Sequence, residues 1–472
     1  MESYEMIIGK PDFGKELEKI AIVNPYTQKE IAYVPKGGEQ EAIRAVDKAH
    51  HAFPDWAALP AYERSTLLMK WHELIERDKE DLAQTMTLEQ GKPTKEALGE
   101  IEYANDFNKW YAEEGKRLYG ETIPATHPHK RMIVKKQPVG VVAAITPWNF
   151  PAAMITRKVA PALAVGCTVV IKPSSQTPLT AIKLGRLALE AGIPEGVVNI
   201  VTGESKAISD AWLEDGRVKK ITFTGSTEVG RSLMKKASDT VKKVSLELGG
   251  LAPAIVMDDS DLEKAADGVI ATKFRNAGQT CVCANRIYVQ ESIAEEFTKI
   301  FTEKVKALKT GDGLEEGTQI GPLIDKKALE KVGNHVQDAL DKGAEVATGG
   351  QKVDGLIYEP TVLTGVTEDM LCMNEETFGP VAPISTFKTE EEAIQRANDT
   401  IYGLAAYLFT ENLSRGIRMS EQLEYGIVGL NDGSPSSAQA PFGGFKQSGL
   451  GREGGRQGIE EFVEVKYISI GL

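Results

Sequence analysis

The residues of this chain best suited to covalent chemistry are its cysteines, and one of them lies in an unusual local sequence. Cys281 follows Gly278 and Gln279 in a segment whose composition predicts a turn. A cysteine thiolate is a strong nucleophile that attacks electrophilic carbon, whereas a structural cysteine is a small buried apolar residue. We therefore take Cys281 as a candidate nucleophile, with burial in a core as the alternative.

Two polar residues elsewhere have properties that complement such a nucleophile. Glu247 lies in the apolar run 244–248 and precedes two glycines, so its carboxylate is expected to be poorly solvated. Poor solvation raises the pKa of a carboxyl group toward the range useful for a general base. Asn149 carries an amide that could stabilise an oxyanion together with the backbone N–H of Cys281. The simpler interpretations are a surface glutamate at a strand end and an asparagine in a turn.

The elements that must position these residues alternate between apolar runs and helical patterns. Short apolar runs predict strands buried on both faces, and helices between them predict parallel sheets. The alternation stops at Gly249 and Gly250 and then begins again, which predicts two α/β domains. The expected helices cover 61–92 and 95–118, and the expected strands are 139–145, 169–171, 197–201, 221–224 and 244–248, then 254–257, 286–289, 383–387, 404–409 and 427–430.

Two segments fit neither domain. Residues 120–138 look extended and alternate apolar with polar residues over 131–135, and the C-terminal stretch 449–472 alternates over 462–470. An isolated ribbon is barely stable, so we expect the two to pair with each other or with a neighbouring subunit. A flexible loop and a frayed tail are the alternative. The expected division is 1–119 with 139–249, then 250–448, then these two segments as a small β arm.

Length, charge and composition narrow the class of protein. The chain has 472 residues, 42% of them apolar, and a formal net charge of -13. An acidic chain repels nucleic acid and anionic lipid, and no apolar stretch is long enough for a membrane span. Six histidines show no metal-ligand spacing, so no metal is expected. Four cysteines and no signal-peptide pattern favour a reducing compartment, and we expect a cytoplasmic protein.

Five motifs in a fixed order give the chain a resemblance to a known family. They are PWNFP at 147–151, FTGST at 223–227, LELGG at 246–250, FRNAGQTC at 274–281 and ETFGP at 376–380. From about Val23 to the C-terminus the chain resembles the aldehyde dehydrogenase superfamily, and within it most resembles the succinate-semialdehyde dehydrogenases. The resemblance implies a Rossmann-like cofactor domain, a catalytic domain and an oligomerisation arm in a homodimer or homotetramer.

For the catalytic residues the resemblance implies one reaction. Cys281 attacks an aldehyde to give a thiohemiacetal, hydride leaves to NAD(P), and a thioester remains. Glu247 then activates the water that hydrolyses the thioester, and Asn149 donates to the oxyanion. Cys283 is interpreted as a packing residue; the sharper hypothesis is a reversible disulfide with Cys281, which requires a turned backbone.

The cofactor site is less explicit, because no GxGxxG motif opens the first strand–helix unit. Gly225 and Ser226 follow a predicted strand and begin a helix, whose N–H groups suit a pyrophosphate; a plain helix cap is the alternative. The resemblance implies that Ser226 contacts phosphate and that other residues contact the riboses and nicotinamide. These residues are Lys172 and Glu376 for the riboses, with Phe378 and Trp148 near the nicotinamide end.

The segment that begins at Lys172 bears on cofactor choice. Relatives that prefer NAD often carry a glutamate at about the position of Ser175, where it repels a 2′-phosphate. Here Lys172, Ser174 and Ser175 could hold that phosphate through charge and hydroxyl groups. We expect NADP to be preferred, with NAD as a second cofactor; the alternative is that these residues only cap the helix that follows.

The substrate pocket is expected to bind an anion. Arg157 and Arg275 lie near the two catalytic motifs, at positions where relatives that oxidise apolar aldehydes tend to carry aromatic residues. Buried arginines are costly unless an anion compensates them, and a substrate carboxylate would do so. Ser436 resembles the serine that assists in succinate-semialdehyde dehydrogenases, with Ser437 as the choice one register away. The alternative is that both arginines form salt bridges within the protein.

These residues together predict oxidation of succinate semialdehyde to succinate, with glutarate semialdehyde or lactaldehyde as alternative substrates. A cysteine hydrolase is disfavoured, because no histidine lies in a suitable motif. The non-enzymatic hypothesis is a catalytically inactive structural or binding homologue. It does not explain why Cys281, Glu247 and Asn149 are all present.

Overall fold

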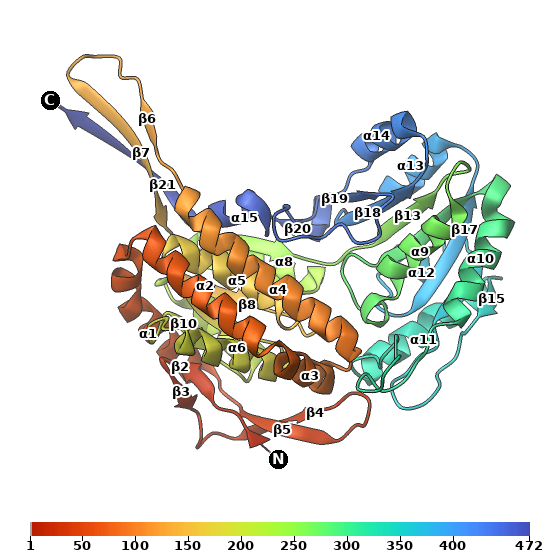
Figure 1. The fold of residues 1–472 in the computed structure, drawn as a ribbon, viewed down its shortest axis with the longest axis horizontal. Coiled ribbons are helices and arrows are strands. Elements are labelled where there is room, and N and C mark those ends of the chain that lie inside the picture. The colour runs from red at the N-terminus through yellow and green to blue at the C-terminus, as the bar shows by residue number, and fades with distance from the viewer. Residues whose placement is uncertain (1) are drawn as a thin grey trace.

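The computed structural model describes residues 2–472 and confirms a mixed α/β fold built on two separate sheets (Figure 1). In the larger sheet the five central strands run parallel, and the edge strands are antiparallel to their neighbours. Its strands, in spatial order, are β20 (Gly449–Leu450), β12 (Lys243–Glu247), β11 (Val218–Thr224), β8 (Val141–Ile145), β9 (Thr168–Lys172), β10 (Val198–Ile200), β2 (Met6–Ile8) and β3 (Lys10–Phe13).

Helices cover both faces of this sheet. Successive residues of each strand point to opposite faces, and both sets of side chains are apolar and pack against helices. Val141 and Ala143 pack with one set of helices, while Val142 and Ala144 pack with the other. The first set is α1 (Glu39–Ala58), α7 (Ser205–Glu214) and α8 (Thr227–Ala237), and the second is α2 (Ala61–Arg77), α3 (Lys79–Gln90), α4 (Thr94–Glu114), α5 (Ala153–Val165) and α6 (Pro178–Glu190).

The second sheet has seven strands, all parallel except for one edge strand. Its order is β15 (Glu345–Thr348), β16 (Thr361–Thr364), β17 (Val381–Phe387), β14 (Ala284–Gln290), β13 (Ala252–Val256), β18 (Ala405–Phe409) and β19 (Ile427–Leu430). The helices that pack on it include α9 (Leu262–Lys273) and α10 (Ala294–Lys306) on one face, and α11 (Lys326–Asp341), α13 (Glu390–Asn398) and α14 (Leu413–Gln422) on the other.

The two segments outside the sheets pair with each other. β7 (Lys130–Pro138) and β21 (Val463–Gly471) form an antiparallel ribbon from Val463 opposite Pro138 to Gly471 opposite Lys130, and β6 (Glu121–Ile123) adds a third strand. This arm projects from the body beyond α15 (Gly455–Glu460) (Figure 1). Of the predicted C-terminal segment, residues 449 and 450 belong instead to the large sheet, because β20 pairs with β12.

Several short elements were not predicted from the sequence. Residues expected to be irregular form β1 (Glu2–Ser3), β4 (Lys19–Val23) and β5 (Glu30–Pro35), a small sheet of their own. The single helix expected over 61–92 is two helices, because Asp78 leaves the helical conformation at φ -103° and ψ 16°. None of the helices within residues 2–472 is both long enough and apolar enough to span a membrane.

Candidate active site

The candidate site lies where the carboxyl edge of the large sheet meets the amino edge of the second sheet. Loops that follow β8, β11 and β12 line a cavity of ≈ 370 Å³ from one side. The opposite wall comes from residues that precede β14 and β17. The carboxyl ends of parallel strands are the usual location of ligand sites in open α/β sheets. Of the residues predicted to act in catalysis, Asn149 and Cys281 line the cavity between the two sheets. Glu247 itself does not line it, but the next two residues, Leu248 and Gly249, do.

Cys281 lies on a loop with an unusual backbone. Asn276, Ala277 and Gly278 have φ values of 52°, 54° and 74°, so three consecutive residues adopt the left-handed conformation. A side chain at Gly278 would meet the Gly379 carbonyl oxygen at 2.2 Å, which explains the glycine there. The turn continues through a hydrogen bond from the Cys283 N–H to the Thr280 carbonyl, at 3.1 Å. Strained backbone of this kind is common at functional sites.

The thiol of Cys281 is partly buried in this loop. Burial raises the pKa of Cys281 to about 12, while the nearby Arg157 guanidinium acts in the opposite direction. At neutral pH the thiol therefore keeps its proton, and a base must remove it before the sulfur becomes a strong nucleophile. The structure thus calls for a proton acceptor close to this cysteine.

Glu247 is the carboxylate that ends β12, and its side chain is nearly inaccessible, with the residue 2% exposed. Burial raises the pKa of Glu247 well above its usual value, and the neighbouring Glu453 carboxylate raises it further. Its Oε2 atom is buried and makes no hydrogen bond to any described residue. Gly443 leaves room for the carboxyl group, because a Cβ there would lie 2.9 Å from Oε1. A carboxyl group with a raised pKa is a stronger base than an exposed one, as a general base requires.

Asn149 follows β8 and is held against the Cys281 loop. Its Nδ2 donates to the Gln279 carbonyl at 3.0 Å, and its own carbonyl accepts from Lys92 Nζ at 2.8 Å and Asn276 Nδ2 at 3.1 Å. An amide nitrogen carries two hydrogens, so a second donor on Nδ2 is available for a bound oxygen. The Asn149 side chain is therefore held by the Cys281 loop, while its backbone carbonyl is held by Lys92 and Asn276.

The two candidate substrate arginines differ in their surroundings. Arg157 on α5 is 2% exposed, and its Nε forms an ion pair with Glu453, which also contacts Lys158. Its guanidinium lies 4.4 Å from the centre of the Phe442 ring. The argument that a substrate anion must compensate both arginines therefore fails for Arg157, because Glu453 already does so. The Arg157 Nη2 atom is nevertheless buried and donates no hydrogen bond to residues 2–472.

Arg275 is the arginine that forms no ion pair with the described residues, although the buried Glu96 carboxylate lies near enough to interact with its charge. It is partly buried at the start of the strained loop and lies 5.3 Å from the centre of the Phe150 ring. Its Nε is buried without a hydrogen-bond partner, and the described chain contains no carboxylate in an ion pair with it. A buried guanidinium with an open donor favours an anion from outside the protein.

Glu453 is a site residue that the sequence did not reveal. It lies in the run GREGG at 451–455, and its carboxylate contacts both Arg157 and Lys158. Burial alone would raise the pKa of Glu453, but these two cations hold it below its usual value. Glu453 is therefore ionised, while Glu247 beside it is the carboxyl group that can gain or lose a proton. The role of Glu453 becomes visible only through its contact with Lys158, which lies 295 positions away in the chain.

Ser436 and Ser437 are both partly buried in the loop that follows β19. The Ala440 N–H donates to the Ser437 carbonyl at 3.3 Å and turns the chain toward Phe442, whose ring packs on Arg157. The loop therefore approaches the side of the site on which Arg157 lies.

A groove suited to a dinucleotide leads into the site. A second cavity of ≈ 730 Å³ shares Pro147, Trp148, Thr224 and Gly225 with the first, and reaches Ser174 and Ser175 at its other end. α8 begins beside this groove, and its N-cap Ser226 accepts from the Val229 N–H at 3.4 Å. The unpaired N–H groups of a helix start attract phosphate, so the groove fits a pyrophosphate-containing cofactor.

Lys172 lies under the Ser174–Ser175 end of the groove. Its Nζ donates to the Pro173 carbonyl at 2.7 Å and to Ser175 Oγ at 3.4 Å, and no carboxylate of the described residues pairs with it. Burial lowers the pKa of Lys172 to about 8. A bound phosphate would compensate this charge, and the residue at 175 brings no negative charge that would repel one.

At the other end of the groove lie Glu376, Phe378 and Trp148. The Gly250 N–H donates to Glu376 Oε1 at 3.3 Å, and burial raises the pKa of this carboxyl group to about 7. The rings of Trp148 and Phe378 meet edge to face, with centres 5.6 Å apart. Phe378 has a φ of 55°, a rare conformation for a bulky residue, which aims its ring toward the cavity that it lines.

Cys283 is fully buried two residues beyond the nucleophile. All four cysteines of the described chain are free thiols, and the Cys283 sulfur accepts a hydrogen bond from Lys273 Nζ at 3.2 Å. The backbone turns between the two cysteines, as a disulfide between them would require, and that disulfide stays a prediction. Within residues 2–472 no cluster of three or more His, Cys, Asp or Glu residues is arranged to hold a metal ion.

Known proteins match this chain over almost its whole length. A sequence model described as aldehyde dehydrogenase family matches residues 13–468. The succinate-semialdehyde dehydrogenase [NADP(+)] of Escherichia coli (strain K12) is 54% identical, covering 96% of this chain and 95% of the relative. A glutarate-semialdehyde dehydrogenase of Pseudomonas putida is also 54% identical, with the same coverage. A crystal structure of an E. coli NADP-dependent enzyme superposes with a TM-score of 0.98 at 53% identity, covering 99% of this chain and 98% of that one.

Proposed function

The chain belongs to the aldehyde dehydrogenase family, and on that basis we propose that it oxidises succinate semialdehyde to succinate, with NADP as its preferred cofactor and NAD as a second one. One observation carries the substrate assignment: Arg275 is partly buried near the Cys281 loop, with an open donor and no ion pair to the described residues. A carboxylate at the far end of the aldehyde supplies a partner for this donor. The Escherichia coli relative is named for this substrate and this cofactor.

The first step forms a bond between Cys281 and the aldehyde. Glu247 accepts the thiol proton, and the sulfur attacks the carbonyl carbon, which becomes tetrahedral and carries an oxyanion. The Asn149 amide and the Cys281 backbone N–H donate to this oxygen. The raised pKa of Glu247 suits it to accept a proton whose original pKa is high.

The second half of the reaction releases the acid. When bound, the nicotinamide cofactor supplies the hydride acceptor that allows the thiohemiacetal to become a thioester. Glu247 first releases to solvent the proton that it took from the thiol. It then takes a proton from water, the resulting hydroxide attacks the thioester carbonyl, and the carbon–sulfur bond breaks. The Cys281 sulfur takes the proton from Glu247, and the product acid gives its own proton to solvent and leaves as succinate. The residues Trp148, Gly225, Ser226, Glu376 and Phe378 hold the cofactor in the groove, with Lys172, Ser174 and Ser175 at the 2′-phosphate.

The substrate carboxylate binds between Arg275, the free Nη2 of Arg157 and the hydroxyl of Ser436. Arg157 stays charged because Glu453 is ionised, so the two arginines present positive charge on two sides of the pocket. Neutral aldehydes of equal length lack the carboxylate and bind less well.

The direct experiment compares aldehydes and cofactors in a steady-state assay. The purified protein is mixed with NADP or NAD and with succinate semialdehyde, glutarate semialdehyde or butanal, and reduced cofactor is followed by absorbance. The proposal predicts the highest kcat/KM for succinate semialdehyde with NADP. A higher kcat/KM for butanal would overturn the anion-binding pocket, and a higher one for NAD would overturn the cofactor assignment.

Glutarate semialdehyde is the second candidate substrate. It is favoured by the glutarate-semialdehyde dehydrogenase of Pseudomonas putida, which is as similar to this chain as the Escherichia coli relative. It carries the same carboxylate one methylene further from the aldehyde. One methylene in a pocket changes discrimination by about 10- to 200-fold, so the ratio of the two kcat/KM values separates these candidates.

We also propose that the β arm joins copies of the chain into a homodimer or homotetramer in the cytoplasm. The arm exposes apolar side chains that one copy leaves uncovered, which are Ile123, Val465, Tyr467, Ile468 and Ile470. Four free thiols fit a reducing compartment. Light scattering on the purified protein gives the mass of the assembly, and a monomeric mass would contradict this arrangement.

A further inference from the structure

The junction between α3 and α4 carries buried polar groups that the proposed reaction does not use. Gln90 ends α3, Lys92 follows after one glycine, and Glu100 lies in the second turn of α4. Lys92 is 2% exposed, and its Nζ forms an ion pair with the equally buried Glu100. Burying a charged pair is costly and seldom adds stability over an apolar pair, so its location calls for an explanation.

The pair is bonded to the segment that carries the oxyanion donor. Lys92 Nζ donates to the Asn149 carbonyl at 2.8 Å and lies 4.1 Å from the centre of the Phe150 ring. Glu100 Oε1 accepts from the N–H groups of Ala152 and Ala153, at 2.9 Å and 3.3 Å. The cation therefore holds one end of the segment from 149 to 153, and the carboxylate holds the other.

A ring of amides connects the same junction to the nucleophile loop. Asn276 Nδ2 donates to the carbonyls of Asn149 and Gln279, and its Oδ1 accepts from Gln90 Nε2 at 3.0 Å. The Lys92 N–H closes the ring by donating to Gln90 Oε1 at 2.9 Å. Asn149 and the Cys281 loop come from different sheets, so the junction adds a second connection between them beside the direct hydrogen bond from Asn149 Nδ2 to the Gln279 carbonyl.

We propose that Lys92 and Glu100 are a positioning pair that sets the distance of the Asn149 amide from Cys281. The inference rests on the proposed role of Asn149 as the oxyanion donor. A misplacement of about 1 Å at a reacting group can lower a rate by about 100-fold, which is the size of effect expected when the pair is broken. The pair does not touch the substrate, and its effect on the reaction passes through Asn149.

A double-mutant cycle tests whether Lys92 acts on the reaction through Asn149. Lys92→Met in the parent chain is expected to lower kcat about 100-fold, with the KM for the aldehyde little changed. In an Asn149→Ala chain, the same Lys92→Met change is expected to cause no further loss, because the group it positions is gone. Equal losses in the two backgrounds, or an unchanged kcat in the parent background, would overturn the proposal.

A matched control separates positioning from loss of a buried ion pair in general. Lys220 is also fully buried, pairs with Glu461 and lies 5.3 Å from the centre of the Phe462 ring, but it lines neither cavity. Lys220→Met is expected to lower the melting temperature without lowering kcat. If Lys92→Met changes only the melting temperature in the same way, Lys92 is a structural residue and the proposal is wrong.

Two further choices keep the test decisive. Should Lys92→Met fail to fold, Glu100→Gln keeps the shape of the carboxyl group, removes its charge, and enters the same cycle. All rates are measured with the aldehyde that the parent chain oxidises best. Failure of succinate semialdehyde as a substrate then counts against the proposed function alone, while an additive cycle counts against the positioning pair alone.

Discussion

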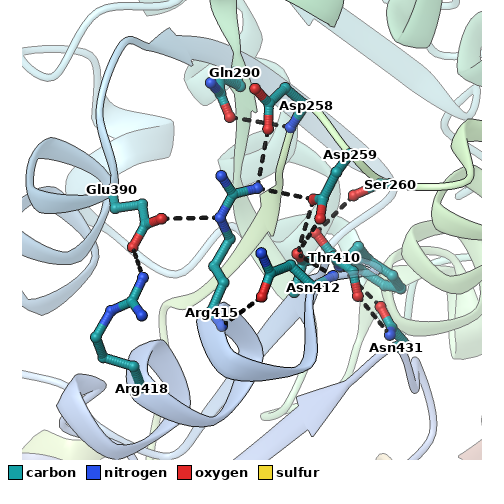
Figure 2. A network of polar contacts seen from close by, with 11 residues as sticks. Asp258, Asp259, Ser260, Gln290, Glu390, Thr410, Asn412, Arg415, Arg418 and Asn431 are labelled. Carbon is teal, nitrogen blue, oxygen red and sulfur yellow. Dashed lines mark hydrogen bonds and ion pairs between the residues drawn. The ribbon is translucent and has the colours of Figure 1, made fainter.

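Polar residues gather at the carboxyl edge of each sheet. In the second sheet they bond to one another, whereas in the large sheet several of them have buried atoms without a hydrogen-bond partner. In the second sheet, Arg415 of α14 contacts Asp258, Asp259 and Glu390, each at 2.9 Å. Thr410 bonds to Asp259, and Asn431 bonds both backbone groups of Thr410 (Figure 2). These residues follow β13, β18 and β19 or lie on the helices beside them, so the network closes this edge.

At the corresponding edge of the large sheet, polar groups are buried but incompletely paired. Thr146 Oγ1, Asn149 Oδ1 and Glu247 Oε2 are all buried without a hydrogen bond to the residues that the structure describes. An unpaired buried polar group costs about 1–3 kcal/mol, so its retention points to a role outside folding. We call the edge of the second sheet, whose polar groups are paired, the closed edge, and its role is structural. The edge of the large sheet, which has spare donors and acceptors and faces Cys281, is the open edge.

The largest expected effect comes from the base on the open edge. Glu247→Gln removes the proton acceptor for both half-reactions while leaving a side chain of nearly the same shape. Loss of a general base lowers kcat about 10²- to 10⁴-fold, and we expect a value near the middle of that range with succinate semialdehyde. Steady-state kinetics measures it, and a kcat equal to that of the parent would remove Glu247 from the mechanism.

The next largest effect is expected from Arg275, the arginine of the proposed pocket that forms no ion pair with the described residues. Arg275→Ala removes its guanidinium. Loss of a charged hydrogen bond worth about 2 kcal/mol corresponds to a rise of about 30-fold in the KM for succinate semialdehyde. The KM for butanal should stay at its parent value. Arg275→Lys, which keeps the charge, is the matched control. A similar rise for both aldehydes would contradict the carboxylate-binding role.

A pH series sharpens the account of the cofactor groove. The pKa of Lys172 is lowered to about 8, so its amine is protonated at neutral pH and loses its charge as the pH rises through that value. The preference for NADP over NAD should therefore fall by about tenfold between about pH 7 and about pH 9, following the protonated fraction. Lys172→Arg should flatten this dependence. A preference that stays constant in the parent chain would separate Lys172 from the 2′-phosphate.

The smallest effect belongs to the closed edge. Arg415→Met breaks the partly exposed network of Figure 2 and is expected to lower the free energy of unfolding by about 1 kcal/mol, because ion pairs near solvent contribute little. The kcat should not change, since the network lines neither cavity. Denaturant unfolding and steady-state kinetics on the same preparation check both statements. A reduced kcat would show that the two edges are coupled.

The sequence predicted the open edge better than the elements around it. Most strands of the two sheets were predicted because their apolar runs are continuous. The missed strands β2, β3, β15, β16 and β20 have only two to four residues each, and β3 and β15 are largely exposed. Cys281, Glu247 and Asn149 belong to local motifs that can be read from neighbouring letters. Glu453 and Lys92 do not, because their roles arise from contacts with residues far away in the chain. Asn276 lies inside the FRNAGQTC motif, but its bond to Asn149 appears only in the structure.

The account depends most on the acylation of Cys281. The direct measurement is to mix the parent protein with NADP and succinate semialdehyde, quench in acid before the first turnover is complete, and determine the masses of its peptides. We predict one succinyl group on the peptide that contains Cys281, and none in a folded Cys281→Ala protein, which should also be inactive. An unmodified Cys281 peptide alongside reduced cofactor, or a Cys281→Ala protein as fast as the parent, would contradict the mechanism.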